Sequence, residues 1–257
     1  MTLAVTLDRF LNGRITLAQP VSGFRAGHDS VLLAAAVPAE ADSRVLELGS
    51  GAGVASLCLA ARVPGARITG IEIDPDLVRL ANENAARNAF ADRVSFVTAD
   101  ANQDGPLFPP PFTGEVSRSD GGGNFDHVFF NPPFHPDSAH VSPVTARDHA
   151  TRDSTDAVRA WTGRALALAR DGGTITAIVR ADRVEEIVDS AHGYGGILFP
   201  LHPRSGDKPK RVIVQIQKRK GGEFATATGL ILHESDGRST EAAEAVLRHG
   251  RALTIAP

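Results

Sequence analysis

The stretch RVLELGSGAGVASLCLAARV, residues 44–63, decides the fold. Its first part, RVLEL, is a short apolar run of the kind that forms a strand buried on both faces. Three glycines at alternate positions follow (Gly49, Gly51 and Gly53), and they allow a tight turn because glycine lacks a β-carbon. The next apolar run, residues 54–63, has the length and composition of a helix. Strand, glycine turn and helix in this order predict the opening unit of a parallel α/β sheet.

The chain downstream repeats this alternation of short apolar runs and helical patterns. A second strand is expected over residues 66–73, and Pro75 then opens a helix at a position where proline is favoured. Further strands are expected over residues 93–100, 125–131, 174–180, 195–202 and 211–217, and further helices over 153–170 and 181–193. Asp171-Gly172-Gly173 is a C-cap signal that predicts the end of the helix over 153–170. This order predicts an α/β fold with one doubly wound, mostly parallel sheet of seven strands.

Composition divides the chain into parts of different character. The division is an N-terminal hairpin and helix over residues 1–42, an α/β core over residues 43–220, and a C-terminal extension with one strand and one helix over residues 221–257. Asn12-Gly13 predicts the turn of the hairpin. Within the core, residues 104–124 hold five glycines, four prolines and few aliphatic residues, so we expect a mobile insertion there.

The overall composition limits the class of protein. The chain has 257 residues, a net charge of -3 and 42% hydrophobic residues, which suits a soluble globular protein and excludes a disordered or coiled-coil chain. No apolar run approaches the roughly 18 residues that span a bilayer, and no basic region followed by an apolar core marks a secretory signal. The only cysteine, Cys58, excludes a disulfide framework and a cysteine zinc site. We therefore expect a cytoplasmic protein that does not bind membranes.

Positive charge is distributed unevenly along the chain. All four lysines lie between Lys208 and Lys220, alongside Arg204, Arg211 and Arg219, and Asp207 is the single acid within residues 204–220. A run of charge is most often a solvated face. It also suits a phosphate-binding surface, because local field rather than net charge attracts phosphates. Both interpretations stay open; in the second, the residues that meet structured RNA are Arg204, Lys208, Lys210 and Arg211.

The glycine turn and Glu72 together indicate a ligand site at the carboxyl edge of the sheet. Open parallel sheets bind ligands there, and an acid about twenty residues beyond such a turn is placed to hold a pair of ribose hydroxyls. The spacing G-x-G-x-G differs from the G-x-G-x-x-G of dinucleotide binders, and the turn carries no lysine for a phosphate. A cofactor with a nucleoside but no pyrophosphate therefore fits best. The alternative is a glycine-rich connection that binds nothing.

A second motif, Asn131-Pro132-Pro133-Phe134, directly follows the expected strand FDHVFF and so belongs to the same edge. An exocyclic amine on an aromatic ring is a poor nucleophile because its lone pair is delocalised. The amide oxygen of Asn131 and the carbonyl of Pro132 can accept its two N–H groups and stabilise charge that develops on the nitrogen. The prolines hold these oxygens in place, and Phe134 offers a face for a planar substrate. The alternative is a plain turn, because Asn-Pro and Pro-Pro are common breakers.

These motifs resemble those of a known family. ELGSGAG (47–53), GIEID (70–74), TADA (98–101) and NPPF are similar to motifs I to IV of the class I S-adenosylmethionine-dependent methyltransferases, whose core is Rossmann-like. NPPF resembles the branch that methylates adenine N6, guanine N2 or glutamine N5. GFRAGHDSVLLAAAVPA, RDHATRDS and KRVIVQIQKRK resemble more specifically the bacterial tRNA(Val) adenine-37 N6-methyltransferase family. The resemblance extends from about Leu7 to Gly250 and implies an enzyme that uses S-adenosylmethionine to methylate adenine N6 in tRNA.

Carried over residue by residue, the resemblance implies two sets of site residues. Those implied for the cofactor are Arg25, His28, Glu47, Gly49, Ser50, Gly51, Gly53, Glu72, Ile73, Asp100, Ala101 and Asn131. In this set Glu72 would hold the ribose, Ile73 would pack on the adenine and Asp100 would accept from the adenine amine. Arg25 and His28, with Asp29, would close over the carboxylate of the cofactor, and an ordinary helix start is an equal alternative for them. Those implied for the target amine are Asn131, Pro132 and Phe134.

Other functions remain open at this point. One alternative is an enzyme that methylates the amide of a protein glutamine by the same chemistry. In that case the basic segment would have no part in substrate binding. Methylation of a small-molecule hydroxyl is disfavoured, because NPPF supplies no base to deprotonate the hydroxyl. A nucleotide-binding module without turnover is a further alternative, but NPPF would then have no role. The 104–124 insertion, which the family pattern does not require, lies close enough to the site to alter substrate choice.

Residue types that often bind metals or react receive a plainer interpretation here. The histidines around NPPF match no metal-site spacing, so no metal is expected; they are His127, His135, His140 and His149. Cys58 and Trp161 lie on apolar helix faces and are expected in the core.

Overall fold

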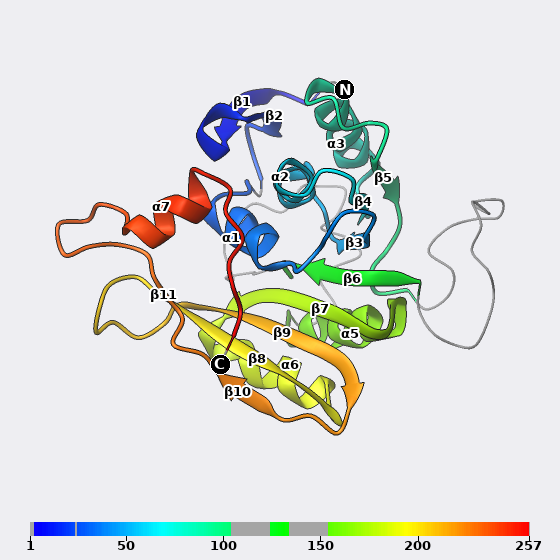
Figure 1. Ribbon diagram of the computed structural model, residues 1–257. Helices are drawn as coiled ribbons and strands as arrows, with labels where there is room; N and C mark the ends of the chain where they lie inside the picture. The colour runs from blue at the N-terminus through cyan, green and yellow to red at the C-terminus, as the bar shows by residue number, and fades with distance from the viewer. Residues whose placement is uncertain (1–2, 24, 104–123, 134–153, 257) are drawn as a thin grey trace.

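The structure, a computed structural model, describes residues 3–23, 25–103, 124–133 and 154–256 (Figure 1). Its strands are β1 (Val5–Phe10), β2 (Ile15–Pro20), β3 (Arg44–Leu48), β4 (Arg67–Glu72), β5 (Val94–Thr98), β6 (Phe125–Phe130), β7 (Ala169–Arg180), β8 (Tyr194–His202), β9 (Arg211–Lys220), β10 (Phe224–Thr226) and β11 (Leu230–Ile231). Its helices are α1 (His28–Ala36), α2 (Val54–Arg62), α3 (Pro75–Arg87), α5 (Ser154–Leu168), α6 (Val184–Ser190) and α7 (Glu241–Leu247), with short 3-10 turns η1 (Leu11–Gly13) and η2 (Ala181–Arg183). Almost all of the predicted 104–124 insertion, and Phe134, lie outside the described residues.

The central sheet has the predicted mostly parallel, doubly wound arrangement. In the described part of the chain nine strands pair in the order β10-β8-β9-β7-β6-β3-β4-β5, and β11 also pairs with β8. Only β9 runs antiparallel to its neighbours, β7 and β8. All seven strands predicted for the core are present. β10 and β11 extend the sheet beyond seven. β11 is the strand expected in the C-terminal extension, whereas β10 has 3 residues, too few for an apolar pattern to be recognised.

Helices cover both faces of the sheet, and each face has its own apolar core. Val45 of β3 and Phe129 of β6 join the core that contains residues of α1, α2 and α3. Leu46 of β3 and Phe130 of β6 join the core that contains residues of α5 and α6. Successive residues of a strand point to opposite faces, and burial on both faces explains why these strands are continuous apolar runs. No helix in the described ranges is long and apolar enough to cross a membrane.

The helix predicted over 153–170 ends earlier than expected. α5 stops at Leu168, and Gly172 and Gly173 lie within β7 rather than at a helix end. Gly172 has a φ of 75°, and a β-carbon on Gly173 would lie 2.8 Å from the carbonyl oxygen of Asp126 in β6. Gly172 therefore supplies a left-handed backbone position, and Gly173 allows β7 to approach β6 closely. In the sequence, this pair of glycines resembles a helix C-cap.

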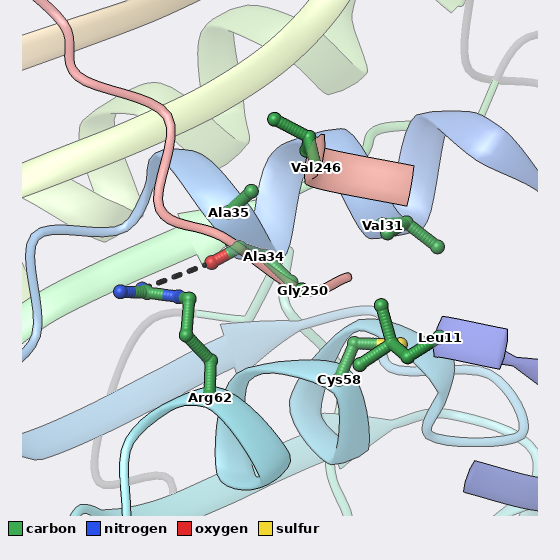
Figure 2. A pocket seen from close by; sticks show the side chains of 8 residues that line it. All are labelled: Leu11, Val31, Ala34, Ala35, Cys58, Arg62, Val246 and Gly250. Atoms are coloured by element: carbon green, nitrogen blue, oxygen red, sulfur yellow. Dashed lines mark hydrogen bonds between the residues drawn. The ribbon is translucent and has the colours of Figure 1, made fainter. Parts of the chain in front are cut away.

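The N-terminal and C-terminal parts of the chain pack together on α2 (Figure 2). β1 and β2 form the expected antiparallel hairpin as a separate two-stranded sheet. Apolar side chains from η1, α1, α2 and α7 meet in a small pocket; they include Leu11, Val31, Cys58 and Val246. Beside them the Arg62 guanidinium donates a hydrogen bond to the carbonyl oxygen of Ala34 at 3.1 Å. Cys58 is buried, as predicted, and burial raises the pKa of its thiol to about 12, so the thiol stays protonated.

Candidate active site

Strand register places the main predicted site residues in one row. Leu48 of β3 pairs with Phe130 of β6 on one side and with Ile71 of β4 on the other. The residues that follow these three leave the carboxyl edge side by side: Gly49, Asn131 and Glu72. Strand order reverses at β3, because the chain proceeds from β3 to β4 and β5 in one direction and to β6 and β7 in the other. This is the place where open α/β sheets bind ligands.

The three alternate glycines each have a left-handed backbone. Their φ angles are 67° at Gly49, 54° at Gly51 and 86° at Gly53, a region that disfavours other residues. A β-carbon on Gly49 would lie 2.4 Å from Cη2 of Trp161, and one on Gly53 would lie 2.7 Å from Cζ of Phe96. At Gly51, by contrast, no heavy atom of the described chain lies within 4 Å of that position. Packing beneath the loop therefore explains two of the glycines, while Gly51 faces open space.

Glu72 is held by the backbone of the loops on both sides of it. Its Oε2 accepts from the N–H of Gly51 at 2.9 Å, and its Oε1 accepts from those of Ile73 at 2.9 Å and Asp74 at 3.1 Å. Burial raises the pKa of its carboxyl above the ordinary value, and the backbone hydrogen bonds act against that rise. The carboxylate is fixed in direction and retains acceptor capacity for hydroxyls. Ile73, directly after it, is 41% exposed.

Glu47, near the end of β3, and Ser50, within the glycine loop (residues 49–53), both have buried side chains. Glu47 is buried and accepts from both the backbone N–H and the hydroxyl of Ser56 in α2. Burial raises the pKa of its carboxyl to about 8. The N–H of Ser50 donates to the carbonyl of Ile71 at 2.9 Å, and its buried hydroxyl has no hydrogen-bond partner within the described chain. Glu47 thus ties the end of β3 to the first turns of α2, and Ser50 ties the loop to β4.

A connection that the sequence did not indicate runs from Asp100 to Trp161. Asp100 Oδ1 accepts from the backbone N–H of Asn102 at 2.8 Å and from its side-chain amide at 3.0 Å. Asn102 Oδ1 in turn accepts from the indole N–H of Trp161 in α5 at 3.1 Å. Trp161 is buried, as predicted, and its ring lies at 76° to that of Phe130, with centroids 6.0 Å apart. It also closes the space under Gly49. Ala101, between Asp100 and Asn102, is buried.

The first residue of the NPPF motif, Asn131, carries a buried polar atom without a hydrogen-bond partner in the described chain. This atom is its side-chain amide oxygen, Oδ1. Pro132 is buried and Pro133 is exposed. A buried acceptor without a partner costs free energy, and such atoms are rare in native proteins. The orphaned oxygen therefore points to a donor supplied by a ligand.

The N-terminal residues proposed for the cofactor are partly engaged elsewhere. Arg25 is exposed and pairs with Asp8 of the hairpin at 2.6 Å. His28, the first residue of α1, is exposed. Asp29 pairs with Arg211 of β9 at 3.0 Å. Because Arg211 lies at the carboxyl edge, this ion pair brings the first turn of α1 to that edge, while Arg25 faces the hairpin.

The basic segment does not form one surface. Arg204, Lys208 and Lys210 are exposed in the loop between β8 and β9. This loop lies at the carboxyl edge, because Leu201 pairs with Arg211 there. Strand β9 then carries the chain to the opposite edge, where Lys220 pairs in register with Tyr194. Lysines adjacent in sequence thus lie at both ends of a ten-residue strand.

Comparison with known proteins gives the family. Residues 39–193 match the methyltransferase domain family. The chain belongs to this family. It is 30% identical over 213 residues to the tRNA1(Val) (adenine(37)-N6)-methyltransferase of Porphyromonas gingivalis, a match that covers 80% of this chain and 79% of that protein. It is 32% identical over 130 residues to the release factor glutamine methyltransferase of Chlorobaculum tepidum, which covers 50% of this chain and 40% of that protein.

A solved structure supports the same fold for the methyltransferase. A predicted O-methyltransferase from Agrobacterium tumefaciens superposes with a TM-score of 0.69 at 24% identity, over 88% of this chain and 98% of the other. Within the described residues, no three His, Cys, Asp or Glu side chains gather as a metal site. His127, in the middle of β6, contacts the hydroxyl of Thr174 through Nδ1 at 2.8 Å. His135, His140 and His149 lie outside those residues.

Proposed function

We propose that this methyltransferase uses S-adenosylmethionine to methylate the N6 amine of an adenine in tRNA. The observation that carries the proposal is the buried Oδ1 of Asn131, which lacks a partner in the described chain and stands one strand away from the glycine loop. An acceptor at that place suits an N–H donor that arrives with the substrate. The extent of the catalytic core, residues 43–220 with extensions on either side, is part of this proposal.

The glycine loop and its neighbours fit a nucleoside cofactor that carries no phosphate. Gly51 leaves open space where a ligand can approach the backbone, and Glu72 offers a fixed carboxylate to two ribose hydroxyls. Ile73 is exposed beside it and can pack on the adenine. Asp100, held by Asn102, is the proposed acceptor for the adenine amine. The loop has no lysine or arginine to pair with a phosphate.

Catalysis requires the protein mainly to position the target amine and to stabilise the charge that develops on its nitrogen. S-adenosylmethionine, when bound, supplies an electrophilic methyl group on a positively charged sulfur. Asn131 Oδ1 and the carbonyl of Pro132 accept the two N–H groups of the target amine and so orient its lone pair. They also stabilise the positive charge that develops on nitrogen, before the surplus proton leaves to water. Phe134 is the proposed stacking face for the base.

Two observations favour tRNA as the substrate. The protein from Porphyromonas gingivalis, similar over most of this chain, is named as a tRNA methyltransferase. Arg204, Lys208 and Lys210 are exposed at the same edge of the sheet as Asn131, and none of them forms an ion pair with a described residue. Unpaired cations near a site suit a phosphate backbone, which dominates affinity for nucleic acids. Arg211 joins this surface while it pairs with Asp29.

A protein glutamine is the second candidate. The relative from Chlorobaculum tepidum acts on a release factor by its name, and glutamine N5 also presents an NH2 group to Asn131. That match covers half of this chain, which is less than the match to the tRNA enzyme. In this alternative the basic loop between β8 and β9 would have no role in catalysis.

Transfer of labelled methyl separates these substrates. The purified protein is incubated with methyl-labelled S-adenosylmethionine and either total RNA or total protein, and the RNA is then digested to nucleosides. We expect label in N6-methyladenosine from the tRNA fraction, and loss of that label after ribonuclease treatment of the substrate. Label in protein that survives ribonuclease would support the glutamine alternative. Failure to label either fraction, with Asn131→Ala as the inactive control, would count against amine methylation altogether.

A further inference from the structure

The N-terminal hairpin is attached to α3 by two asparagines one helical turn apart. β2 pairs with β1 along one edge, and its other edge faces α3. Asn88 accepts from the N–H of Thr16 at 3.0 Å and donates to its carbonyl at 2.9 Å. Asn84 accepts from the N–H of Ala18 at 2.8 Å and donates to its carbonyl at 2.9 Å. Four residues of helix rise about 6 Å and two residues of strand about 6.6 Å, so the two side chains match the strand edge.

Asn84 makes one contact that Asn88 does not. Its Nδ2 donates a second hydrogen bond, at 3.0 Å, to the carbonyl oxygen of Ala52 in the glycine loop. The second donated bond of Asn88 goes instead to the carbonyl of Asn84, at 2.8 Å. Asn84 is completely buried, and its Oδ1 also accepts from Arg87 at 2.6 Å. All four hydrogen-bonding positions of its amide are therefore occupied.

Apolar packing joins the same three parts of the molecule. Ala18 of β2, Ala52 of the glycine loop and Leu80 of α3 form a small buried cluster of their own. A β-carbon on Gly53 would lie 3.3 Å from that of Ala81 in α3, so the loop lies directly on the helix. The position of the hairpin and the shape of the loop are thus linked through one amide group.

We propose that Asn84 is a positioning residue for the cofactor loop, through which docking of the N-terminal hairpin sets the affinity for the cofactor. This role rests on the proposed function, because it requires that the loop binds S-adenosylmethionine. Without the amide, the buried carbonyl of Ala52 loses its partner and the loop is free to turn that oxygen toward water. The loop conformation that binds the cofactor then becomes one of several. The apparent affinity falls in proportion to the fraction of molecules whose loop retains that conformation.

Asn84 and Asn88 provide a matched pair of variants. Asn84→Ala and Asn88→Ala each remove two hydrogen bonds to β2, but only Asn84→Ala removes the contact with Ala52. We expect both to lower the melting temperature, Asn84→Ala by more because its completely buried amide also loses the bonds with Ala52 and Arg87. We expect Asn84→Ala to weaken binding of S-adenosylmethionine about tenfold by calorimetry, with Asn88→Ala within about twofold of the parent. The Michaelis constant for the cofactor should rise with Asn84→Ala, while turnover at saturating cofactor stays unchanged.

Thermodynamic linkage between cofactor binding and hairpin docking provides a second measurement, which a purely structural role of Asn84 would not affect. If the hairpin and the loop are coupled, the cofactor must stabilise the hairpin to the same extent. Amide hydrogen exchange at Leu17, which pairs with Asp8 of β1 rather than with either asparagine, should therefore slow when S-adenosylmethionine is added to the parent and to Asn88→Ala, but not when it is added to Asn84→Ala.

The outcomes separate this role from the proposed function. A parent that does not bind S-adenosylmethionine would overturn both. A parent that binds it, with equal dissociation constants for the two variants, would overturn the role of Asn84 alone. If Asn84→Ala does not fold, Asn84→Asp replaces it, since a carboxylate still accepts from Ala18 and Arg87 and loses only the donated bonds. Parental affinity in folded Asn84→Asp would equally overturn the role.

Discussion

Glu72 and Asn131 leave the sheet on either side of β3, yet their surroundings differ. Both oxygens of Glu72 accept backbone N–H groups, and Asp100 is held by Asn102 in the same manner. Asn131 Oδ1 has no partner in the described chain, and the basic side chains of the β8–β9 loop are not paired there. The half proposed for the cofactor is preorganised by the protein's own hydrogen bonds. The half proposed for the substrate, Asn131 and the β8–β9 loop, has an acceptor and cations whose partners a ligand must supply. Changes in the first half should therefore affect binding, and changes in the second should affect turnover or RNA affinity.

The largest effect is expected at Asn131. Removing one preorganised electrostatic partner typically lowers a rate by about 10²–10³-fold, so Asn131→Ala should lose that much in single-turnover methyl transfer at saturating cofactor. Its affinity for S-adenosylmethionine should stay within about threefold of the parent, because the lost contact is to the target amine. Asn131→Asp should retain more activity, since a carboxylate still accepts from the amine. Transfer at the parental rate in Asn131→Ala would mean that NPPF is only a turn.

Glu72→Ala tests the other side of the comparison. Loss of a charged acceptor from a partly buried site should weaken binding of S-adenosylmethionine by about 2–3 kcal/mol. Calorimetry measures the dissociation constant directly. Asp76→Ala, which removes an exposed carboxylate from the first turn of α3, is the matched control and should leave it unchanged. Equal affinities for parent and Glu72→Ala would show that the acid is misassigned.

The buried Glu47 makes the stability of the unliganded protein depend on pH. Its carboxyl has a pKa of about 8 in the folded protein and an ordinary value of 4.5. The folded state therefore keeps a proton that the unfolded chain releases, and stability is lost as pH rises from 4.5 through 8. Glu47→Gln mimics the protonated form, so between pH 6 and pH 9 the parent should lose about 3 kcal/mol more stability than this variant. Urea unfolding at the two pH values measures the difference, and equal losses would contradict the prediction.

The basic loop should determine how binding to RNA depends on salt. Arg204, Lys208 and Lys210 changed together to Ala should reduce the slope of log affinity against log salt by about two to three units. Arg219 and Lys220, changed together to Ala, provide the control, because they are exposed at the opposite edge of the sheet. Equal slopes for the triple variant and the parent would remove this loop from the RNA surface.

The sequence predicted most of the fold because each core strand is a short apolar run that the doubly wound sheet buries on both faces. It placed Glu72 and Asn131 well for a related reason: each lies at or next to the end of such a run, so the strand order alone brings them to one edge. Glycine was less informative. Gly172 and Gly173 suggested a helix end, whereas in the structure Gly172 has a left-handed backbone within β7 and Gly173 allows β7 to approach β6 closely.

The residues that support the site were not predictable in this way. Asn84 reaches a partner 66 positions away, and Trp161 reaches one 59 positions away. No local pattern marks such contacts, because they depend on how α3 and α5 pack on the sheet. The four lysines, close in the sequence, are separated by the fold, although the four residues predicted to meet RNA all lie at or next to the carboxyl edge. Ten residues of strand extend over about 33 Å, so neighbours in the sequence of β9 lie at opposite edges of the sheet.

The smallest expected effect concerns Trp161, which belongs to the cofactor half although it lies in α5. Trp161→Phe keeps an aromatic ring beside Phe130, but removes the indole N–H that Asn102 accepts and the outer ring atoms that lie under Gly49. Asn102 would then hold Asp100 less firmly, and we expect the affinity for S-adenosylmethionine to fall about fivefold, near 1 kcal/mol. A double-mutant cycle with Asn102→Ala separates this path from the packing of the smaller ring. If Trp161 acts through Asn102, its replacement should have little further effect on cofactor affinity once Asn102 is Ala. Full additivity of the two changes would show that Trp161 supports the loop through packing alone, and the hydrogen-bonded connection to Asp100 would then carry no part of the binding free energy.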